Sequence, residues 1–209
     1  DAFPFSVHRL SPWIQYGNAA LVPQVARKLS HFDIVHVHYP FFGGAESIFF
    51  LKKRPGGFPR VVMSYHMDVI GQGFLKLFFR AYAKRVLPAL VKRSDALVYA
   101  TRGYAETSLI SRHLRERIGY EIPYGVDSRF KPAPKDDLLK ARFGITSGDR
   151  IALFVGGLDR AHYFKGVSVL IRAIAQLKRN DIKLLIVGNG DLIPNYRSEI
   201  DRFSLQERI

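Results

Sequence analysis

The segment LFVGGLDRAHYFKGVSVLI, which runs from Leu153 to Ile171, contains the strand, turn and helix on which the fold depends. An apolar run that begins at Ile151 ends at Gly156-Gly157, as expected for a strand that leads into a sharp turn. Apolar side chains then recur at the spacing of one buried helix face, at Val167, Leu170, Ile171, Ile174 and Leu177. Polar and charged side chains lie between the two elements, at Asp159, Arg160, His162 and Lys165. The segment therefore predicts a strand–helix unit whose turn carries more charge than a simple connection needs.

The same alternation of short apolar runs and helical patterns extends along the chain. Strands are expected at 33–38, 61–65, 96–100, 120–122, 151–155 and 182–187. Helices are expected at 18–30, 45–53, 73–93, 102–114, 136–143 and 167–178. Parallel strands need crossover connections, so this order predicts an α/β fold with parallel sheets. A proline-rich stretch, IPYGVDSRFKPAPKDD, interrupts the pattern and predicts two domains, at 1–130 and 131–209.

Composition limits the classes of function. The 209 residues contain no cysteine, which excludes disulfides and thiolate metal sites and fits a reducing compartment. No apolar run is long enough to cross a membrane without charges. Lys and Arg number 32 against 18 acidic residues, and this net charge of +14 predicts an anionic partner. The chain lacks an initiator Met and ends inside an amphipathic pattern, so we expect a piece of a longer chain.

The turn after Val155 has the features of a phosphate-binding site. Gly156 and Gly157 let the backbone approach a ligand, while the helix that begins near Gly166 presents free N–H groups beside Lys165. A solvated turn without a ligand is the alternative, and spacing alone does not decide between them. The stretch VGNGD (187–191) repeats the arrangement after the next strand, with Gly188 and Gly190. Neither stretch matches the P-loop or the G-x-G-x-x-G fingerprint, which argues against a nucleotide hydrolase or a dinucleotide enzyme.

Taken together, these motifs resemble those of the family-four retaining glycosyltransferases. The resemblance rests, in the family's order, on FDIVHVHYP (32–40), VVMSYHMDVIGQG (61–73), SDALVYATRGYAETS (94–108), IPYGVDSRFKP (122–132), the opening segment and LLIVGNGDL (184–192). It implies a GT-B fold of two Rossmann-like domains, an acceptor-side domain followed by a nucleotide-sugar domain. Both are expected to be incomplete, because the Gly-rich acceptor loop would precede Asp1 and the paired donor-site glutamates would follow Ile209. We therefore do not expect the 209 residues to catalyse transfer alone.

The resemblance also implies a reaction and its residues. A hexosyl group would pass from a nucleotide-diphosphate sugar to a lipid-linked or polysaccharide acceptor with retained anomeric configuration, and no cofactor is expected. The implied catalytic residues are His66, which faces the donor sugar, and Lys165, which neutralises the leaving diphosphate. The implied donor-binding residues are Gly156, Gly157, Arg160, Lys165, Gly188 and Gly190. Gly157 stands where the family often has Arg, and Arg160 is the candidate substitute. Asp68 is a candidate for orienting His66.

Metal-dependent transfer is not expected, because the sequence contains no D-x-D motif. His36 and His38 alternate along a strand and so share one face of the sheet. Two histidines on one face could bind a metal, but the sequence places no third ligand beside them. Hydrogen-bonded strand histidines are the preferred interpretation.

The predicted helix 73–93 suggests where the positive charge is used. Lys76, Arg80 and Lys84 follow one another at four-residue steps, and aromatic residues occupy the other side. The helix could lie on an anionic membrane, or it could be an ordinary surface helix with its aromatics in the core. We expect a cytoplasmic protein, peripheral on the inner face of the cell membrane, that does not bind nucleic acid. The alternatives are a sugar-nucleotide epimerase of the same fold and a basic, non-catalytic module that binds nucleic acid or membrane.

Overall fold

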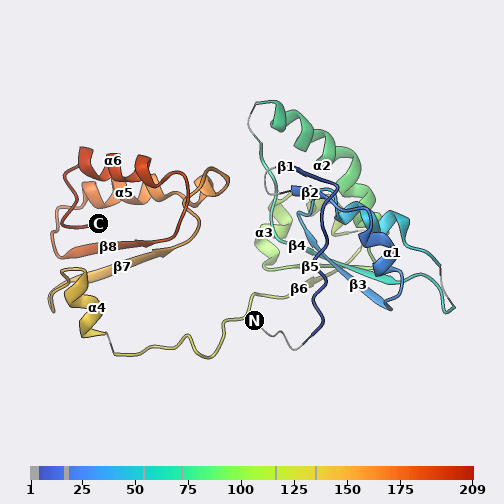
Figure 1. The fold of residues 1–209 in the computed structure, drawn as a ribbon, viewed down its shortest axis with the longest axis horizontal. Helices are drawn as coiled ribbons and strands as arrows, with labels where there is room; N and C mark the ends of the chain where they lie inside the picture. Colours follow the sequence, from blue (N-terminus) through green and yellow to red (C-terminus); the bar gives the residue numbers. More distant parts are fainter. Residues whose placement is uncertain (1–4, 17–18, 54, 72, 116, 135) are drawn as a thin grey trace. The chain divides into compact units, whose positions relative to one another are not determined.

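The structure is a computed structural model, and it describes residues 5–16, 19–53, 55–71, 73–115, 117–134 and 136–209. The chain forms two compact units, unit 1 up to Ser128 and unit 2 from Arg129 to Ile209 (Figure 1). Each unit combines helices with a parallel sheet, which confirms the predicted fold class.

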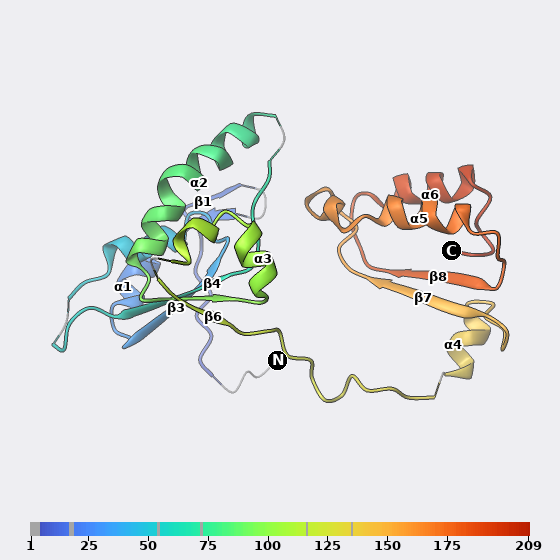
Figure 2. The same ribbon diagram turned by 180° about the vertical axis from the view of Figure 1, so that it is seen from behind.

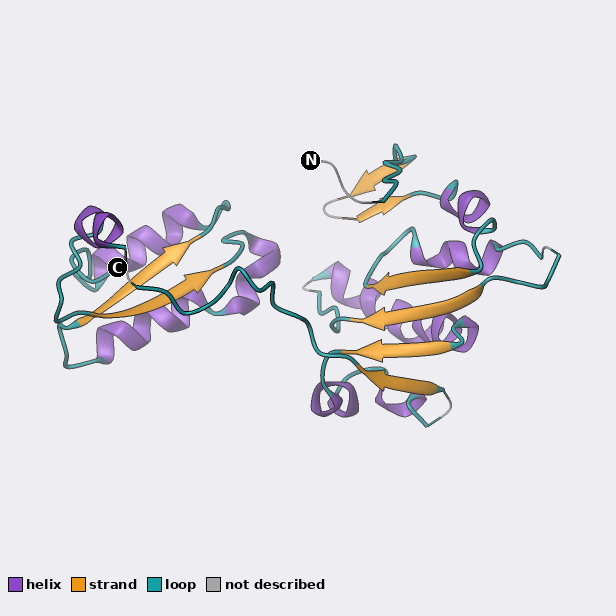
Figure 3. Cartoon of the chain, turned by 90° about the horizontal axis from the view of Figure 1, so that it is seen from below, coloured by secondary structure: helices purple, strands orange, loops and turns teal. Residues whose placement is uncertain are grey.

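Unit 1 is built on four parallel strands in the order β3-β4-β5-β6, seen side by side in Figure 3. They are β3 (Ile34–Tyr39), β4 (Arg60–Tyr65), β5 (Ala96–Tyr99) and β6 (Ile118–Glu121). Odd-numbered side chains of β3 and β4 are buried against the 3-10 helix η1 (Ala45–Phe50) and α2 (Phe74–Arg93), forming the core. The even-numbered side chains point to the opposite face, where His36 and His38 are exposed.

The helix expected at 18–30 is wrong for most of its length. Asn18 lies outside the described residues, and Ala19–Leu21 form strand β2, which pairs antiparallel with β1 (Ile14–Tyr16). Only α1 (Val25–Leu29) is helical. Pro23 explains the boundary, because proline fits the start of a helix but not its interior.

Two other helices differ from the prediction. The segment expected at 45–53 is the 3-10 helix η1, and it ends at Phe50. The helix expected at 102–114 divides into α3 (Arg102–Thr107) and the 3-10 turn η2 (Ser111–His113). The hydroxyls of Thr107 and Ser108 donate to backbone carbonyls one turn earlier, which competes with continuation of the helix.

Unit 2 contains two parallel strands, β7 (Arg150–Val155) and β8 (Ile182–Val187), with Val155 opposite Val187. Helices α5 (Val167–Gln176) and α6 (Ile193–Arg202) lie side by side over one face of these strands (Figure 2). The short helix α4 spans Asp137–Arg142 and lies on their other side. Unit 2 has its own core, centred on Ile171, Ile174 and Leu184.

Candidate active site

In unit 1, His66 follows directly on β4, at the carboxyl edge of the sheet. Its backbone N–H donates to Tyr39 O at 3.0 Å, which extends the pairing with β3 one residue beyond the strand. Nε2 of its ring lies 2.7 Å from Nδ1 of His38, and its Nδ1 contacts the hydroxyl of Tyr124. The rings of His38 and His66 are nearly parallel, with 5° between their planes. His66 is therefore held between a neighbouring strand and the segment that follows β6.

His36 belongs to the same row of imidazoles. Its Nε2 lies 2.8 Å from Ser64 Oγ, and its ring centroid is 4.5 Å from that of His38. Although His36 is largely exposed, partial desolvation of its ring, followed by the charge of His38, lowers its pKa. Burial also lowers the pKa of His66, with the neighbouring His38 and His36 adding to the effect. Both rings are therefore neutral near pH 7, and a neutral imidazole can donate or accept a hydrogen bond.

The contacts of Asp68 go to groups other than the His66 ring, and its expected orienting role stays a prediction. Its Oδ1 accepts a hydrogen bond from the hydroxyl of Tyr65 and another from Leu109 N at 3.1 Å. Its own N–H donates to Tyr104 Oη at 2.7 Å. These contacts connect the end of β4 to the segment after β5. The carboxylate therefore holds the backbone of unit 1 together, while Tyr124 and His38 contact the imidazole.

In unit 2, part of the charge in the turn after β7 has a local structural use. Residues Arg160–Lys165 form the 3-10 helix η3, and Asp159 caps it by accepting from Ala161 N and His162 N. The same carboxylate lies 2.8 Å from His162 Nδ1, and this contact lowers the pKa of Asp159. Asp159 and His162 thus satisfy one another without a ligand.

Lys165 behaves differently from these two residues. It is exposed, and within the part of the chain that the structure describes, no carboxylate pairs with it. Its ammonium lies over the backbone of Gly156, because a Cβ built on Gly156 would be only 3.1 Å from Lys165 Nζ. Gly166, with a φ of 74°, then begins α5 without a side-chain cap. An unpaired ammonium and an uncapped helix N-terminus therefore meet at the carboxyl end of β7, and both favour an anion.

The place of the family Arg is occupied by a histidine ring. A Cβ on Gly157 would lie 2.6 Å from His162 Nδ1, so a side chain there requires the imidazole to move. Arg160, the candidate substitute, is highly exposed, and its Nε lies 3.2 Å from Asp191 Oδ2. Its backbone N–H donates to the same carboxylate at 3.0 Å. An anionic ligand would have to compete with Asp191 for this guanidinium.

Gly188 and Gly190 have a packing reason to be glycine. A Cβ on Gly188 would lie 1.9 Å from Gly156 O, and one on Gly190 would lie 2.2 Å from the carbonyl carbon of Leu158. Leu158 N also donates to Asn189 O at 2.9 Å. The two loops therefore pack backbone against backbone, which brings all the predicted donor-binding residues together. Their role in binding a donor stays a prediction.

Helix α2 of unit 1 carries the predicted basic strip, and Lys76, Arg80 and Lys84 are all exposed. The aromatics divide between the two interpretations: Tyr82 is buried in the core, whereas Phe74 is 97% exposed. Leu75, Leu77 and Phe78 are also exposed, so the apolar surface surrounds the first turns of the helix instead of occupying one side. These turns project away from the sheet in Figure 1.

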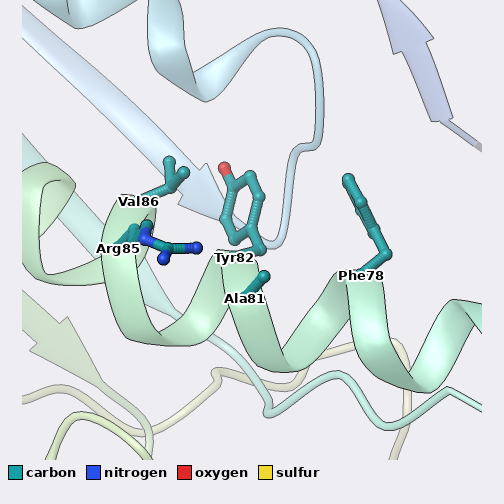
Figure 4. A pocket seen from close by; sticks show the side chains of 5 residues that line it. All are labelled: Phe78, Ala81, Tyr82, Arg85 and Val86. Carbon is teal, nitrogen blue, oxygen red and sulfur yellow. The ribbon is translucent and has the colours of Figure 1, made fainter.

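Two shallow hollows accompany these elements. One, of about 210 Å³, lies along α2 between Phe78 and Val86, with Tyr82 and Arg85 on its walls (Figure 4). The other, of about 370 Å³, is lined by His36, His38 and apolar residues of α1 and the segment after β3.

Over the described ranges, no group of three or more His, Asp or Glu side chains is arranged to hold a metal ion. The three imidazoles contact one another instead. Metal-independent transfer stays a prediction. None of the described helices is both long enough and apolar enough to cross a membrane.

Two residues of these sites were missed by sequence reasoning. Tyr124 follows β6 and carries no local signal that it would reach His66. Asp191 follows β8, and the rule that ligand sites gather at the carboxyl ends of parallel strands could have singled it out.

Comparison with known proteins agrees with the motifs. The chain is similar to a solved alpha,alpha-trehalose-phosphate synthase (UDP-forming) from Burkholderia vietnamiensis, with 12% sequence identity and a TM-score of 0.48. The match covers 88% of this chain and 46% of that one, so the chain spans less than half of that protein's length. No curated protein matches the chain. The sequence profile of Glycosyltransferase Family 4 matches residues 2–130, more than half of the chain. The chain therefore belongs to Glycosyltransferase Family 4.

Proposed function

We propose that the protein transfers a hexosyl group from a nucleotide-diphosphate sugar to a lipid-linked or polysaccharide acceptor, with retention of anomeric configuration. The observation that carries this proposal is the unpaired ammonium of Lys165 beside the uncapped N-terminus of α5. A diphosphate is the anion that both groups would bind in a sugar transferase. Family membership supports the transferase class.

In this mechanism unit 2 holds the leaving group. Lys165 and the first N–H groups of α5 neutralise the charge that develops on the diphosphate as the bond between its oxygen and the anomeric carbon breaks and the acceptor oxygen bonds to that carbon. Gly156 has no side chain of its own, so phosphates bound by the Lys165 ammonium that lies over it can come close to its backbone. Holding the diphosphate in one place also presents the anomeric carbon to the acceptor, which lowers the entropic part of the barrier. His66 of unit 1 contributes a neutral imidazole that hydrogen-bonds the donor sugar.

The surface of α2 supports a lipid-linked acceptor at a membrane. Phe74, Leu77 and Phe78 are exposed around its first turns, and the basic strip of Lys76, Arg80 and Lys84 lies beside them. Apolar side chains can enter the boundary between headgroups and acyl chains, while the basic residues contact anionic headgroups. The net charge of +14 adds a longer-range attraction.

The reaction is tested by product analysis on the transferase that contains these 209 residues. UDP-, GDP- and ADP-sugars are supplied with and without membrane lipid extract as the acceptor source. The proposal is supported if sugar is transferred only when acceptor is present and if NMR shows that the product keeps the anomeric configuration, α or β, of the donor. A rearranged nucleotide sugar formed without acceptor would indicate an epimerase instead.

Membrane contact is tested separately by co-sedimentation with vesicles of phosphatidylglycerol and phosphatidylcholine. The Phe74→Ser/Phe78→Ser variant should lose binding at high salt, where the apolar contribution dominates. Phe143→Ser in unit 2, also an exposed aromatic, provides the matched control. Equal binding of wild type and the α2 variant, or stronger binding to a DNA oligonucleotide than to vesicles, would contradict the lipid surface.

A further inference from the structure

We infer that His38 is a positioning residue for His66, and that the Tyr124 hydroxyl gives way to a substrate hydroxyl at the other ring nitrogen. The inference rests on the role proposed for His66 above. It starts from the contacts of one ring: Nε2 of His66 lies 2.7 Å from His38 Nδ1, and Nδ1 contacts the phenol of Tyr124. A substrate can therefore hydrogen-bond this imidazole only by replacing one of two protein partners.

The register of the sheet makes His38 the fixed partner. His38 lies opposite Ser64 in the parallel pairing of β3 with β4, so His66 is two residues further along on the same face. The backbone of His66 also donates to Tyr39 O, next to His38 in β3. One strand thus holds both the backbone and the ring of His66.

Tyr124 is attached less firmly. It lies two residues beyond Ile122, whose N–H donates to Tyr99 O at 2.9 Å and continues the pairing of β5 with β6. The Tyr124 side chain is 65% exposed. Its ring also stacks on His66, with centroids 5.7 Å apart, but the hydroxyl can leave Nδ1 at the cost of one hydrogen bond that water or a sugar hydroxyl replaces.

The number of ring protons on His38 and His66 allows the Tyr124 hydroxyl to be replaced by a substrate hydroxyl. A neutral imidazole carries one N–H, and a contact between two ring nitrogens needs one donor and one acceptor. If His38 Nδ1 donates to His66 Nε2, then His66 must donate from Nδ1. If His66 donates from Nε2, then its Nδ1 accepts from a hydroxyl. In both cases His38 fixes whether Nδ1 of His66, the nitrogen left to the substrate, carries a proton, because His38 takes the complementary role at Nε2.

Three substitutions separate the two roles. His38→Leu removes the partner of Nε2 and should lower kcat by about ten- to a hundredfold, the effect of a misplaced catalytic group. His38→Asn has a similar shape but places an amide near the position of Nδ1, so it should recover most of that loss. Tyr124→Phe removes the hydroxyl that competes with substrate, so KM should stay equal or fall while kcat is retained. Ile34→Ala, at an exposed position on the same strand and face, is the control and should leave kcat within about twofold.

A spectroscopic readout makes the test independent of activity. Long-range ¹H–¹⁵N spectra report which ring nitrogen carries the proton, and the His66→Gln variant assigns the signal of His66 among those of the other histidines. A single tautomer of His66 in the wild type and in His38→Asn, and a mixture in His38→Leu, is the expected result. An unchanged His66 spectrum in a folded His38→Leu variant would overturn the positioning role even if no transfer were detected in any variant. A fall of kcat in Tyr124→Phe equal to that in His38→Leu would overturn the exchange at Nδ1.

Discussion

The two candidate sites both follow a parallel strand, yet they are built in opposite ways. After β4, the imidazole of His66 has a protein partner at each ring nitrogen, and burial keeps it neutral. After β7, the ammonium of Lys165 has no carboxylate partner among the described residues, while the surrounding backbone is tightly packed. Side chains therefore fix the functional group in unit 1, and backbone packing fixes the site in unit 2. The first arrangement suits orientation of a neutral group, and the second suits attraction of an anion.

The largest effect is expected from removing the cation of unit 2. Lys165→Ala should lower transfer about ten- to a hundredfold, because a charge-assisted phosphate contact is worth roughly 1.5–3 kcal/mol. Transfer kinetics on the transferase that contains this chain measure the loss. Lys178→Ala, an exposed lysine just after α5 in the same unit, is the control. Wild-type activity in a folded Lys165→Ala protein would remove the contrast between the two strand ends.

The next largest effect is expected from a substitution that disturbs the backbone packing of unit 2. Gly188→Ala forces a Cβ against Gly156 O, and overpacking of this kind costs about 1–3 kcal/mol. The loss of unfolding free energy is measured by chemical denaturation, and hydrogen exchange of the β7 and β8 amides then localises it to unit 2. Gly148→Ala is the matched control, since the nearest atom to its Cβ would be 3.9 Å away. Equal stability of the two variants would show that the loops can separate freely.

A smaller effect is expected from the carboxylate beside His66. Asp68→Ala leaves the Tyr65 hydroxyl and Leu109 N without their acceptor and should cost roughly 1–2 kcal/mol of unfolding free energy. Turnover per folded molecule should stay close to wild type, because neither ring nitrogen of His66 contacts Asp68. A large fall of kcat with unchanged stability would support the orienting role that the sequence suggested.

The smallest effect is a difference in acid sensitivity between the units. The lowered pKa values of His36 and His66 mean that folded unit 1 binds fewer protons than its unfolded chain below about pH 6.5. Their contribution to stability is therefore full above that pH and falls as the pH is lowered through it. In unit 2, the lowered pKa values of Asp159 and Asp181 give a contribution that persists down to about pH 3.9 and is lost below it.

Hydrogen exchange at pH 7.5, 6 and 5 compares the two units. Protection in β3 and β4 should weaken before protection in β7 and β8, and His36→Gln should reduce the difference. Simultaneous loss of protection in both units would contradict the assignment of neutral imidazoles to unit 1.

Much of the fold could be predicted from local patterns. The strands at β3, β4, β7 and β8 and the helices α2 and α5 follow directly from apolar spacing, which depends only on neighbouring residues. The hairpin β1–β2 could not be predicted, because Ala19–Leu21 becomes a strand only by pairing with Ile14–Tyr16. Helix α6 and the 3-10 helix η3 were also missed. Most residues of α6 are polar and only one face packs on the core of unit 2, whereas η3 depends on capping by Asp159.

The sequence by itself determined which residue types stand at the ends of the strands: His66 after β4, Gly156 and Lys165 after β7, and Gly188 and Gly190 after β8. Only the tertiary structure decided which side chains meet. His38 and His66 are 28 positions apart, and Arg160 and Asp191 are 31 apart. Strand register joins the first pair, and the packing of one loop on another joins the second. Both pairs depend on contacts between segments that are distant in the sequence, whereas the periodicity of apolar residues reports only on each segment by itself. The tertiary structure was therefore needed to identify the partners of His66 and to show that Lys165 has no carboxylate partner among the described residues.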